Sequence, residues 1–222
     1  MRIELSGVAK GREGAILSAL DLRVRSGHVT LATAETEQRP TVLGLIASGR
    51  MKPDAGAVTL DGARDDRGLR RRVALIDAPD VCDPAPDVSV LGVVSEELMF
   101  AGRRSDPFAA LKWLDEQGLR DLARRPIGQV DPDARIRMLL ELAALRDGVE
   151  ALVLVSPDRH GGDPRRWWRI ARAFADRGYA VLVIAGEAAA TALSDSTPVH
   201  ATPRPSAVRL RRTTGPAGGI RR

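Results

Sequence analysis

Short aliphatic runs alternate with helical patterns along most of the chain. Two of these runs, Ala151–Val155 and Ala180–Ala185, are apolar at every position. That pattern is typical of strands that are covered on both faces, as in a parallel sheet. Two further runs, Val29–Ala32 and Val73–Ile76, are also predicted to be strands. Together the four runs predict a parallel central sheet.

Three shorter apolar segments lie nearer the N-terminus, at Ile3–Leu5, Leu20–Val24 and Val58–Leu60. Their apolar and polar positions alternate more, which is typical of strands with one exposed face. We therefore expect them to form an antiparallel edge. Strands that alternate with helices indicate an α/β fold.

Prolines, acidic caps and glycines mark the predicted helices. One helix is expected from Pro40 to near Gly49, because proline is favoured in the first helical turn. Another is expected to begin at Asp163 and Pro164 and to end near Gly178, with an apolar stripe at helical spacing.

Two more helices are expected in the middle of the chain. One begins after Asp106 and is predicted to turn Phe108, Leu111 and Leu114 toward the core. The other is predicted to be capped by Asp133. Since residues 84–146 hold helical patterns and no strong strand, they predict an inserted helical subdomain.

The charge of the chain is unevenly distributed. The whole chain carries 34 basic and 29 acidic residues. Residues 196–222 hold six arginines and no acidic residue, and one candidate strand at Val208–Leu210. The organisation predicted is therefore a domain over residues 1–195 followed by a basic Pro/Gly/Arg-rich tail over residues 196–222. Such a tail could contact nucleic acid or anionic lipid, although a solvated terminus is the favoured interpretation.

Composition excludes several classes of protein. Hydrophobic residues make up 44% and charged residues 28%, which is a globular balance. The single cysteine, Cys82, excludes an internal disulfide framework and a cysteine-based zinc site. No apolar run approaches the roughly 18–20 residues that span a bilayer. Residues Met1–Leu5 lack the apolar stretch of a signal peptide, so none is expected. We expect a cytoplasmic protein.

The order of segments resembles the ATP-binding cassette (ABC) domain of ABC transporters. The segment Met51–Gly62, Met-Lys-Pro-Asp-Ala-Gly-Ala-Val-Thr-Leu-Asp-Gly, is similar to the turn and strand that follow the phosphate loop in that family. Arg71–Ile76 resembles the strand before the Gln loop, Ala151–Val155 the Walker B strand, and Ala180–Ala185 the strand before the switch histidine. The resemblance implies a P-loop-NTPase-like core with a parallel central sheet, an antiparallel edge and a helical subdomain.

The phosphate loop itself is replaced. Such a loop needs glycines, a lysine and a hydroxyl residue, because its backbone N–H groups and lysine hold phosphates and its hydroxyl holds Mg²⁺. The alignment places the loop on residues 34–41, where Ala34 and Arg39 replace glycines and Pro40 replaces the lysine. Thr41 keeps the hydroxyl position. Thr41 and Arg39 are therefore the residual candidates for nucleotide binding.

Two acidic residues make the same loop unfavourable for phosphate. Glu35 and Glu37 lie where a triphosphate would sit. At about 4–5 Å, each repulsion between a carboxylate and a phosphate costs on the order of 1–4 kcal/mol, depending on solvent.

The other chemical motifs are replaced as well. In the alignment, the Walker B acidic pair falls on Ser156-Pro157, and the Gln-loop glutamine falls on Ala78 or Asp77. The signature falls on residues 132–136, and the switch histidine falls on Gly186. We therefore predict no catalytic residue. The resemblance implies Mg-ATP as a cofactor only if the chain is active despite these replacements.

Other constellations are weaker. A metal site built from Asp158, His160 and Asp163 is conceivable, but loop residues of this kind more often meet water or cap a helix, so no metal is predicted. Asp158 could also approach the Walker B position through a register shift, although a turn residue is favoured. The acids around Cys82 argue against a catalytic thiolate.

Arginines surround the pair Trp167 and Trp168, which could suggest nucleic-acid stacking. Helical spacing favours packing of Trp167 in the core, with Trp168 off that stripe as a candidate exposed contact.

The favoured interpretation is a degenerate ABC-transporter ATP-binding-subunit-like protein that acts as a non-catalytic scaffold or regulatory subunit. The resemblance implies a membrane transporter subunit as partner, another ABC ATPase subunit as a second partner, and a location on the inner face of the membrane. Its partner-contact region would cover about Asp80–Met99, and the candidate contacts are Asp80, Asp87, Glu96, Met99 and Trp168.

Two alternatives stay open. In the first, the chain is a divergent ABC transporter ATPase that uses Thr41, Arg39 and Asp158 and is active with a partner subunit. In the second, which is less favoured, the basic tail makes the chain a nucleic-acid-binding module, with binding that falls steeply with salt.

Overall fold

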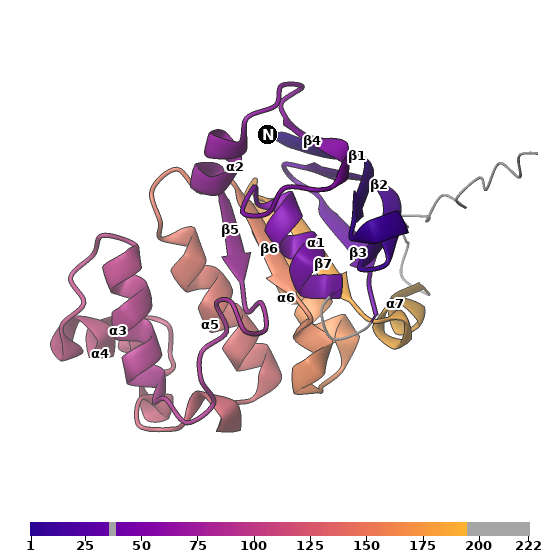
Figure 1. Cartoon of the computed structure of the whole chain (residues 1–222). Coiled ribbons are helices and arrows are strands. Elements are labelled where there is room, and N and C mark those ends of the chain that lie inside the picture. Colours follow the sequence, from indigo (N-terminus) through magenta and orange to yellow (C-terminus); the bar gives the residue numbers. More distant parts are fainter. Residues whose placement is uncertain (36–38, 195–222) are drawn as a thin grey trace, which may run out of the picture.

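The computed structural model describes residues 1–35 and 39–194 (Figure 1). Seven strands form two sheets. Their bounds are β1 Arg2–Lys10, β2 Leu17–Arg25, β3 Val29–Thr33, β4 Ala55–Leu60, β5 Val73–Ile76, β6 Ala151–Val155 and β7 Ala180–Ala185. The helices are α1 Arg39–Ala47, α2 Asp66–Arg72, α3 Val90–Phe100, α4 Pro107–Glu116, α5 Pro132–Ala144, α6 Pro164–Asp176 and α7 Glu187–Ser194. Four short 3₁₀ turns join them, at Arg12–Gly14, Arg120–Leu122, Ile127–Gln129 and Pro157–His160.

The larger sheet is parallel and has the order β3-β7-β6-β5. The smaller sheet is antiparallel and has the order β2-β1-β4. Both sheets were predicted from the pattern of apolar positions, and the α/β class is confirmed. The three antiparallel strands are longer than predicted. In β1 and β2 further buried positions, Val8 and Leu17, extend the alternation, whereas β4 is extended to Ala55 by its pairing with β1.

Alternate residues of the parallel strands face two different cores. In β6, Leu152 and Leu154 pack into the core shared with α3 to α7. Ala151, Val153 and Val155 pack into the core shared with α1 and the antiparallel sheet. The sheet is therefore buried on both faces, which explains why β6 and β7 are apolar throughout.

Helix α1 lies close against the sheet because Gly44 leaves room for it. A β-carbon at Gly44 would lie 2.9 Å from a methyl carbon of Val155 and 3.0 Å from one of Leu75. Contacts this short are outside the normal van der Waals range, so a side chain here would push the helix away from the sheet.

Between β5 and β6 the chain forms α3, α4 and α5, which project to one side of the sheet (Figure 1). The predicted direction of Phe108 was wrong, because its side chain is 83% exposed. The buried residues of α4 are Ala110, Trp113 and Leu114, and Phe108 lies on the opposite side of the helix. Leu111 is half-buried, and Leu114 faces the core as predicted.

The predicted cap of α5 was also wrong. Asp131, and not Asp133, accepts hydrogen bonds from the backbone N–H groups of Asp133 and Ala134, at 3.0 and 3.4 Å. Pro132 occupies the first helical position, so the cap is Asp131, two residues before the predicted Asp133. Asp133 instead pairs with Arg166 of α6 at 3.4 Å.

Candidate functional site

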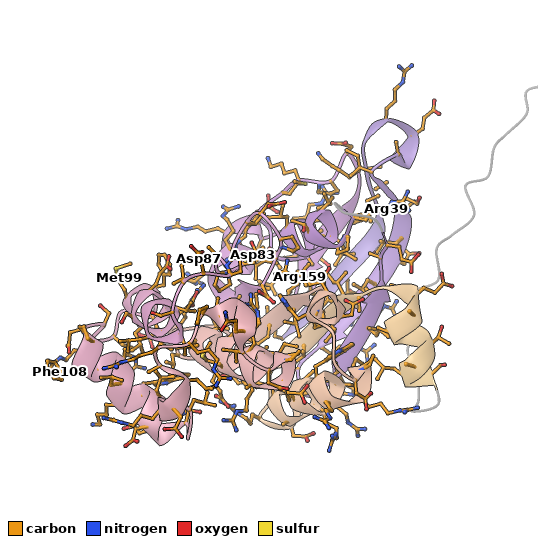
Figure 2. The ribbon with its side chains drawn as sticks, turned by 90° about the horizontal axis from the view of Figure 1, so that it is seen from below. Arg39, Asp83, Asp87, Met99, Phe108 and Arg159 are labelled. Carbon is orange, nitrogen blue, oxygen red and sulfur yellow. The ribbon has the colours of Figure 1, made fainter. Side chains whose placement is uncertain are left out.

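The candidate site lies at the carboxyl edge of the parallel sheet. In sheets of this kind, ligands bind beyond the carboxyl ends of the strands. An acidic residue follows each of the four strands at this edge: Glu35 after β3, Asp77 after β5, Asp158 after β6 and Glu187, the first residue of α7, after β7. Figure 2 views the molecule from the side toward which β5 and β6 point.

The start of α1 offers little for binding phosphate. Pro40 is buried in the first turn and has no N–H to donate. The Thr41 hydroxyl is buried and has no hydrogen-bond partner among the described residues. Arg39 is half-buried and makes no ion pair with a described residue. Figure 2 places Arg39 apart from Arg159, which belongs to the turn after β6.

Two carboxylates converge on the start of α7. Asp158 accepts a hydrogen bond from the backbone N–H of Gly186 at 2.9 Å, and Glu35 accepts one from that of Glu187 at 2.9 Å. A helix start favours anions because its first N–H groups have no partner within the helix. The chain's own carboxylates therefore occupy two of the donors that an external anion could use at this helix start.

Asp77 forms the centre of an ionic cluster. Its side chain is fully buried, and Arg135 of α5 donates to Oδ1 at 2.6 Å. From the turn after β6, Arg159 reaches the same oxygen at 3.0 Å, and Nε2 of His160 lies 2.7 Å from Oδ2. We call these four residues the Asp77 cluster. It joins the strand β5, the turn after β6 and the helix α5.

The cluster keeps Asp77 ionised. Burial by itself disfavours the charged carboxylate, but hydrogen bonds from His160 and Arg135 and the nearby positive charges outweigh it and lower the pKa of Asp77. The Arg135 side chain is only 4% exposed, so both charges of this pair are shielded from water.

The conceivable metal site at Asp158, His160 and Asp163 is not formed. The side chain of His160 contacts Asp77, and the carboxylate of Asp158 accepts from the backbone N–H of Gly186. Asp163 caps α6, because its carboxylate accepts from the backbone N–H of Arg165 at 2.9 Å. Residues 1–35 and 39–194 contain no group of three or more His, Cys, Asp or Glu side chains placed to hold a metal ion.

A small cleft lies between β5, α3 and α5, beside the Asp77 cluster. Its volume is about 200 Å³. Four residues with polar or charged side chains besides Asp77 line it, namely Arg50, Cys82, Glu97 and Arg146. We call it the β5–α3 cleft. Its apolar lining comes from both the sheet and the helices.

Four of the five predicted partner contacts belong to one segment. Asp80, Asp87, Glu96 and Met99 are all exposed and lie between the end of β5 and the end of α3. Figure 2 shows Asp87 and Met99 along the same side of the molecule as Asp83. Trp168 is not in this segment: it is half-buried on α6 and packs against the core.

Trp167 is fully buried, as its helical spacing predicts. The basic tail and its candidate strand at Val208–Leu210 lie outside the described residues, so nucleic-acid binding by the tail stays a prediction. None of the helices in the described part of the chain has the length and apolar character that a bilayer crossing requires.

Sequence reasoning identified Asp77 only as a motif position and missed its partners. A signal existed in α5, where Arg135 shares the helical stripe of Met138, Leu139 and Leu142, which are all buried. An arginine on a buried stripe implies a buried counterion. Its identity depends on the tertiary fold, because Asp77 lies 58 residues away in the chain.

Comparison with known proteins gives a consistent result for the fold. No family model matches the sequence, and no curated protein does. Among solved structures, cbiO1 from Clostridium perfringens, part of the ABC transporter complex cbiONQ, is similar with a TM-score of 0.58 and 16% identity over 83% of this chain and 77% of that one.

Two further structures agree. A nucleotide-free ATP-binding cassette from an ABC transporter has a TM-score of 0.58 and 16% identity, covering 88% of this chain and 85% of its own. A bacterial ABC transporter cassette solved as a dimer has a TM-score of 0.59 and 18% identity, covering 86% and 90%. The chain thus has the fold of ABC transporter ATP-binding cassettes.

Proposed function

We propose that the protein is a non-catalytic member of a membrane transport complex, in which a cassette fold serves as a scaffold or regulatory subunit. The observation that carries this proposal is that three of the four acidic residues at the carboxyl edge of the sheet are held by the chain itself. Glu35 and Asp158 are bound to the start of α7, and Asp77 is enclosed by Arg135, Arg159 and His160.

Mg-ATP does not fit the residues at this edge. A phosphate would meet Pro40, which offers neither an N–H nor a positive charge, and the carboxylate of Glu35. After β6 the chain continues with Ser156 and Pro157, so no carboxylate directly follows this strand to bind a metal ion. We therefore derive no hydrolytic step for the chain.

The exposed segment between β5 and the end of α3 is the proposed contact surface for a membrane-embedded partner. It presents the acids Asp80, Asp87 and Glu96 and the apolar side chain of Met99, which is 56% exposed. Val81 and Val88 add apolar exposure at 48% and 38%. The β5–α3 cleft opens beside this segment, so a partner helix placed here would meet both β5 of the sheet and the helices α3 and α5. One similar protein, cbiO1, is part of such a transporter complex.

The test is calorimetric titration of the full chain with Mg-ATP up to millimolar concentration. We expect no saturable heat and no rise in melting temperature. A bound nucleotide would stabilise the folded state by RT ln(1 + [L]/Kd), about 2.7 kcal/mol at a hundredfold excess over Kd.

The matched control is Thr41→Ala, which removes the hydroxyl at the Mg²⁺-binding position of the aligned loop. Saturable micromolar binding by the parent chain that is lost in Thr41→Ala would overturn the proposal. That result would establish the alternative, a divergent ATPase that becomes active with a partner subunit.

A further inference from the structure

Exposed apolar side chains gather where α3 ends and α4 begins. Phe108, in the first turn of α4, is 83% exposed, and Met99 and Phe100, the last residues of α3, are 56% and 58% exposed. Figure 2 places Met99 and Phe108 at the same end of the molecule. Large apolar side chains that gather on a surface mark sites of contact with a protein or a membrane.

A groove lies beside Phe108. Its volume is about 550 Å³. Its apolar lining consists of Leu98, Phe108, Ala109, Trp113 and Leu145. We call this groove, together with the exposed side chains of Met99 and Phe100, the α3–α4 tip. The β5–α3 cleft and the groove share no lining residue, so they are separate sites.

Cations outnumber acids in the lining of the groove. The charged residues that line it are Arg103, Arg104, Lys112, Asp106 and Glu116. Arg104 pairs with Asp106 at 3.1 Å and Lys112 with Glu116 at 3.8 Å, and the pair of Arg103 with a carboxylate outside the groove is 4.0 Å long. More than half of each cationic side chain is exposed, so these pairs are weak and an external anion can compete with them.

We propose that the α3–α4 tip binds the surface of an anionic lipid bilayer, with Phe108 inserted among the lipids and the cations at the level of the headgroup phosphates. Aromatic side chains flanked by arginine and lysine are typical of the interface between lipid and water. This inference rests on the part of the proposed function that brings the chain to a membrane, and it adds a contact with the lipid itself. Met99 ends the segment proposed to meet a membrane-embedded partner, so the two surfaces are continuous.

A bilayer fits the α3–α4 tip better than a protein helix seated in the groove. Such a helix would cover Phe108 but not Met99 and Phe100, which do not line the groove. The bilayer interface is a broad surface, and it can receive apolar side chains from the ends of two helices. Its negative surface potential complements the excess of cations.

Sedimentation of the full chain with lipid vesicles tests the proposal. The vesicles consist of phosphatidylcholine alone, or of phosphatidylcholine with about one third phosphatidylglycerol. We expect the affinity for the anionic vesicles to be higher by about tenfold or more, and to fall as salt is added. Equal affinity for the two kinds of vesicle, or no binding, would overturn the inference.

Variants of Phe108 assign the binding to the α3–α4 tip. Phe108→Ser should lower the affinity for anionic vesicles by about tenfold, because the burial of an aromatic side chain is lost, whereas Phe108→Leu should keep most of it. The matched control is Ile16→Ser, since Ile16 is 38% exposed and directly precedes β2, which lies away from α3 and α4 (Figure 1). Anionic vesicles that bind Phe108→Ser as tightly as the parent chain would contradict the assignment.

Two double variants separate the α3–α4 tip from the overall charge. The chain has a formal net charge of +5, and residues 196–222 hold six arginines, so the whole chain is attracted to anionic vesicles. Arg103→Gln with Arg104→Gln removes two charges from the tip, and Arg169→Gln with Arg172→Gln removes two from the exposed face of α6. We expect the first pair to lower the affinity about tenfold and the second less than about threefold. Equal losses would show that overall charge alone drives binding, and the inference would be wrong.

Phe108→Trp reports insertion directly. On anionic vesicles we expect its emission to shift to shorter wavelength and to be quenched by brominated acyl chains, because the indole leaves water. Ile16→Trp should change no more than the parent chain, whose three tryptophans give the background. If Phe108→Trp also behaves like the parent chain, the side chain does not enter the bilayer and the proposal fails.

These results are separable from the test of the proposed function. Vesicle binding needs neither a nucleotide nor a protein partner, and melting curves verify that each variant is folded. Mg-ATP binding that is lost in Thr41→Ala contradicts the non-catalytic proposal, whereas absent binding to anionic vesicles contradicts only this inference.

Discussion

The ionic clusters at the two ends of strand β5 differ in their exposure to solvent. At its amino end, Arg72 pairs with Asp61 at 3.0 Å and with Glu150 at 2.7 Å, and both carboxylates are nearly half-exposed. At its carboxyl end, Asp77 is fully buried and pairs with cations from α5 and from the turn after β6. The buried cluster at the carboxyl end is therefore the one that holds α5 against the sheet.

The exposed cluster at the amino end connects neighbouring segments of the chain. Its ion pairs are in contact with water, so they contribute little to the free energy of unfolding. The Asp77 cluster ties α5 to the sheet, and its Arg135–Asp77 pair is shielded from water, so breaking that pair leaves a buried charge. The cluster thus connects α5, the turn after β6 and the end of β5 through the chain's own charges. This arrangement is consistent with the proposed scaffold role.

The largest expected effect comes from Asp77→Asn. The variant keeps the shape of the side chain but leaves Arg135 buried without its counterion, so we expect the free energy of unfolding to fall by about 3–5 kcal/mol. Urea denaturation followed by circular dichroism measures this change. A loss below 1 kcal/mol would show that the two clusters are equivalent and that burial adds nothing.

The second effect is a difference in response to acid. The pKa of Asp77 is lowered in the folded chain, mainly by hydrogen bonds that outweigh burial, so the unfolded chain takes up its proton first as pH falls. Its stabilisation is therefore complete above the unfolded pKa of about 3.9 and is lost as pH falls through the folded pKa.

Parallel denaturation series from pH 7 to pH 3 test this assignment. The parent chain should lose stability more steeply below about pH 4 than Asp77→Asn does, because the variant lacks the group that titrates. Other carboxylates with lowered pKa, such as Glu150, contribute to both proteins alike. Parallel curves for the two proteins would contradict the role given to Asp77.

Features that depend on a local pattern could be predicted from the sequence, whereas features without such a pattern could not. The strands β5, β6 and β7 follow from continuous apolar runs, since burial on both faces is a local pattern. Helices α2 and α7 were not predicted, and α3 was predicted only as part of the helical subdomain over residues 84–146. Helix α2 has seven residues with a single large apolar side chain, and half of α7 is alanine, so neither has a strong apolar stripe.

The candidate site was less predictable, because its contacts are long-range. The sequence shows which catalytic residue types are replaced, but not that Glu35 binds a backbone N–H 152 residues away. Nor does it show that Arg135 is buried against Asp77. Phe108 shows that prediction can also fail within one helix. The sequence did not determine which face of α4 packs on the core, and Phe108 lies on the face that is exposed to solvent.

The smallest expected effect comes from Glu150→Gln at the amino end of β5. Glu150 accepts from Nε and Nη2 of Arg72, at 2.9 and 2.7 Å, which is a good bidentate geometry. Since the carboxylate is 46% exposed, its pairing is screened by water, and Arg72 keeps Asp61 as a partner. We expect a loss of about 0–1 kcal/mol in the same urea denaturation, reduced further in 1 M salt, where the screening length falls to about 3 Å. A loss as large as that of Asp77→Asn would mean that the exposed cluster also holds the fold together, and the distinction between the two ends of β5 would then be wrong.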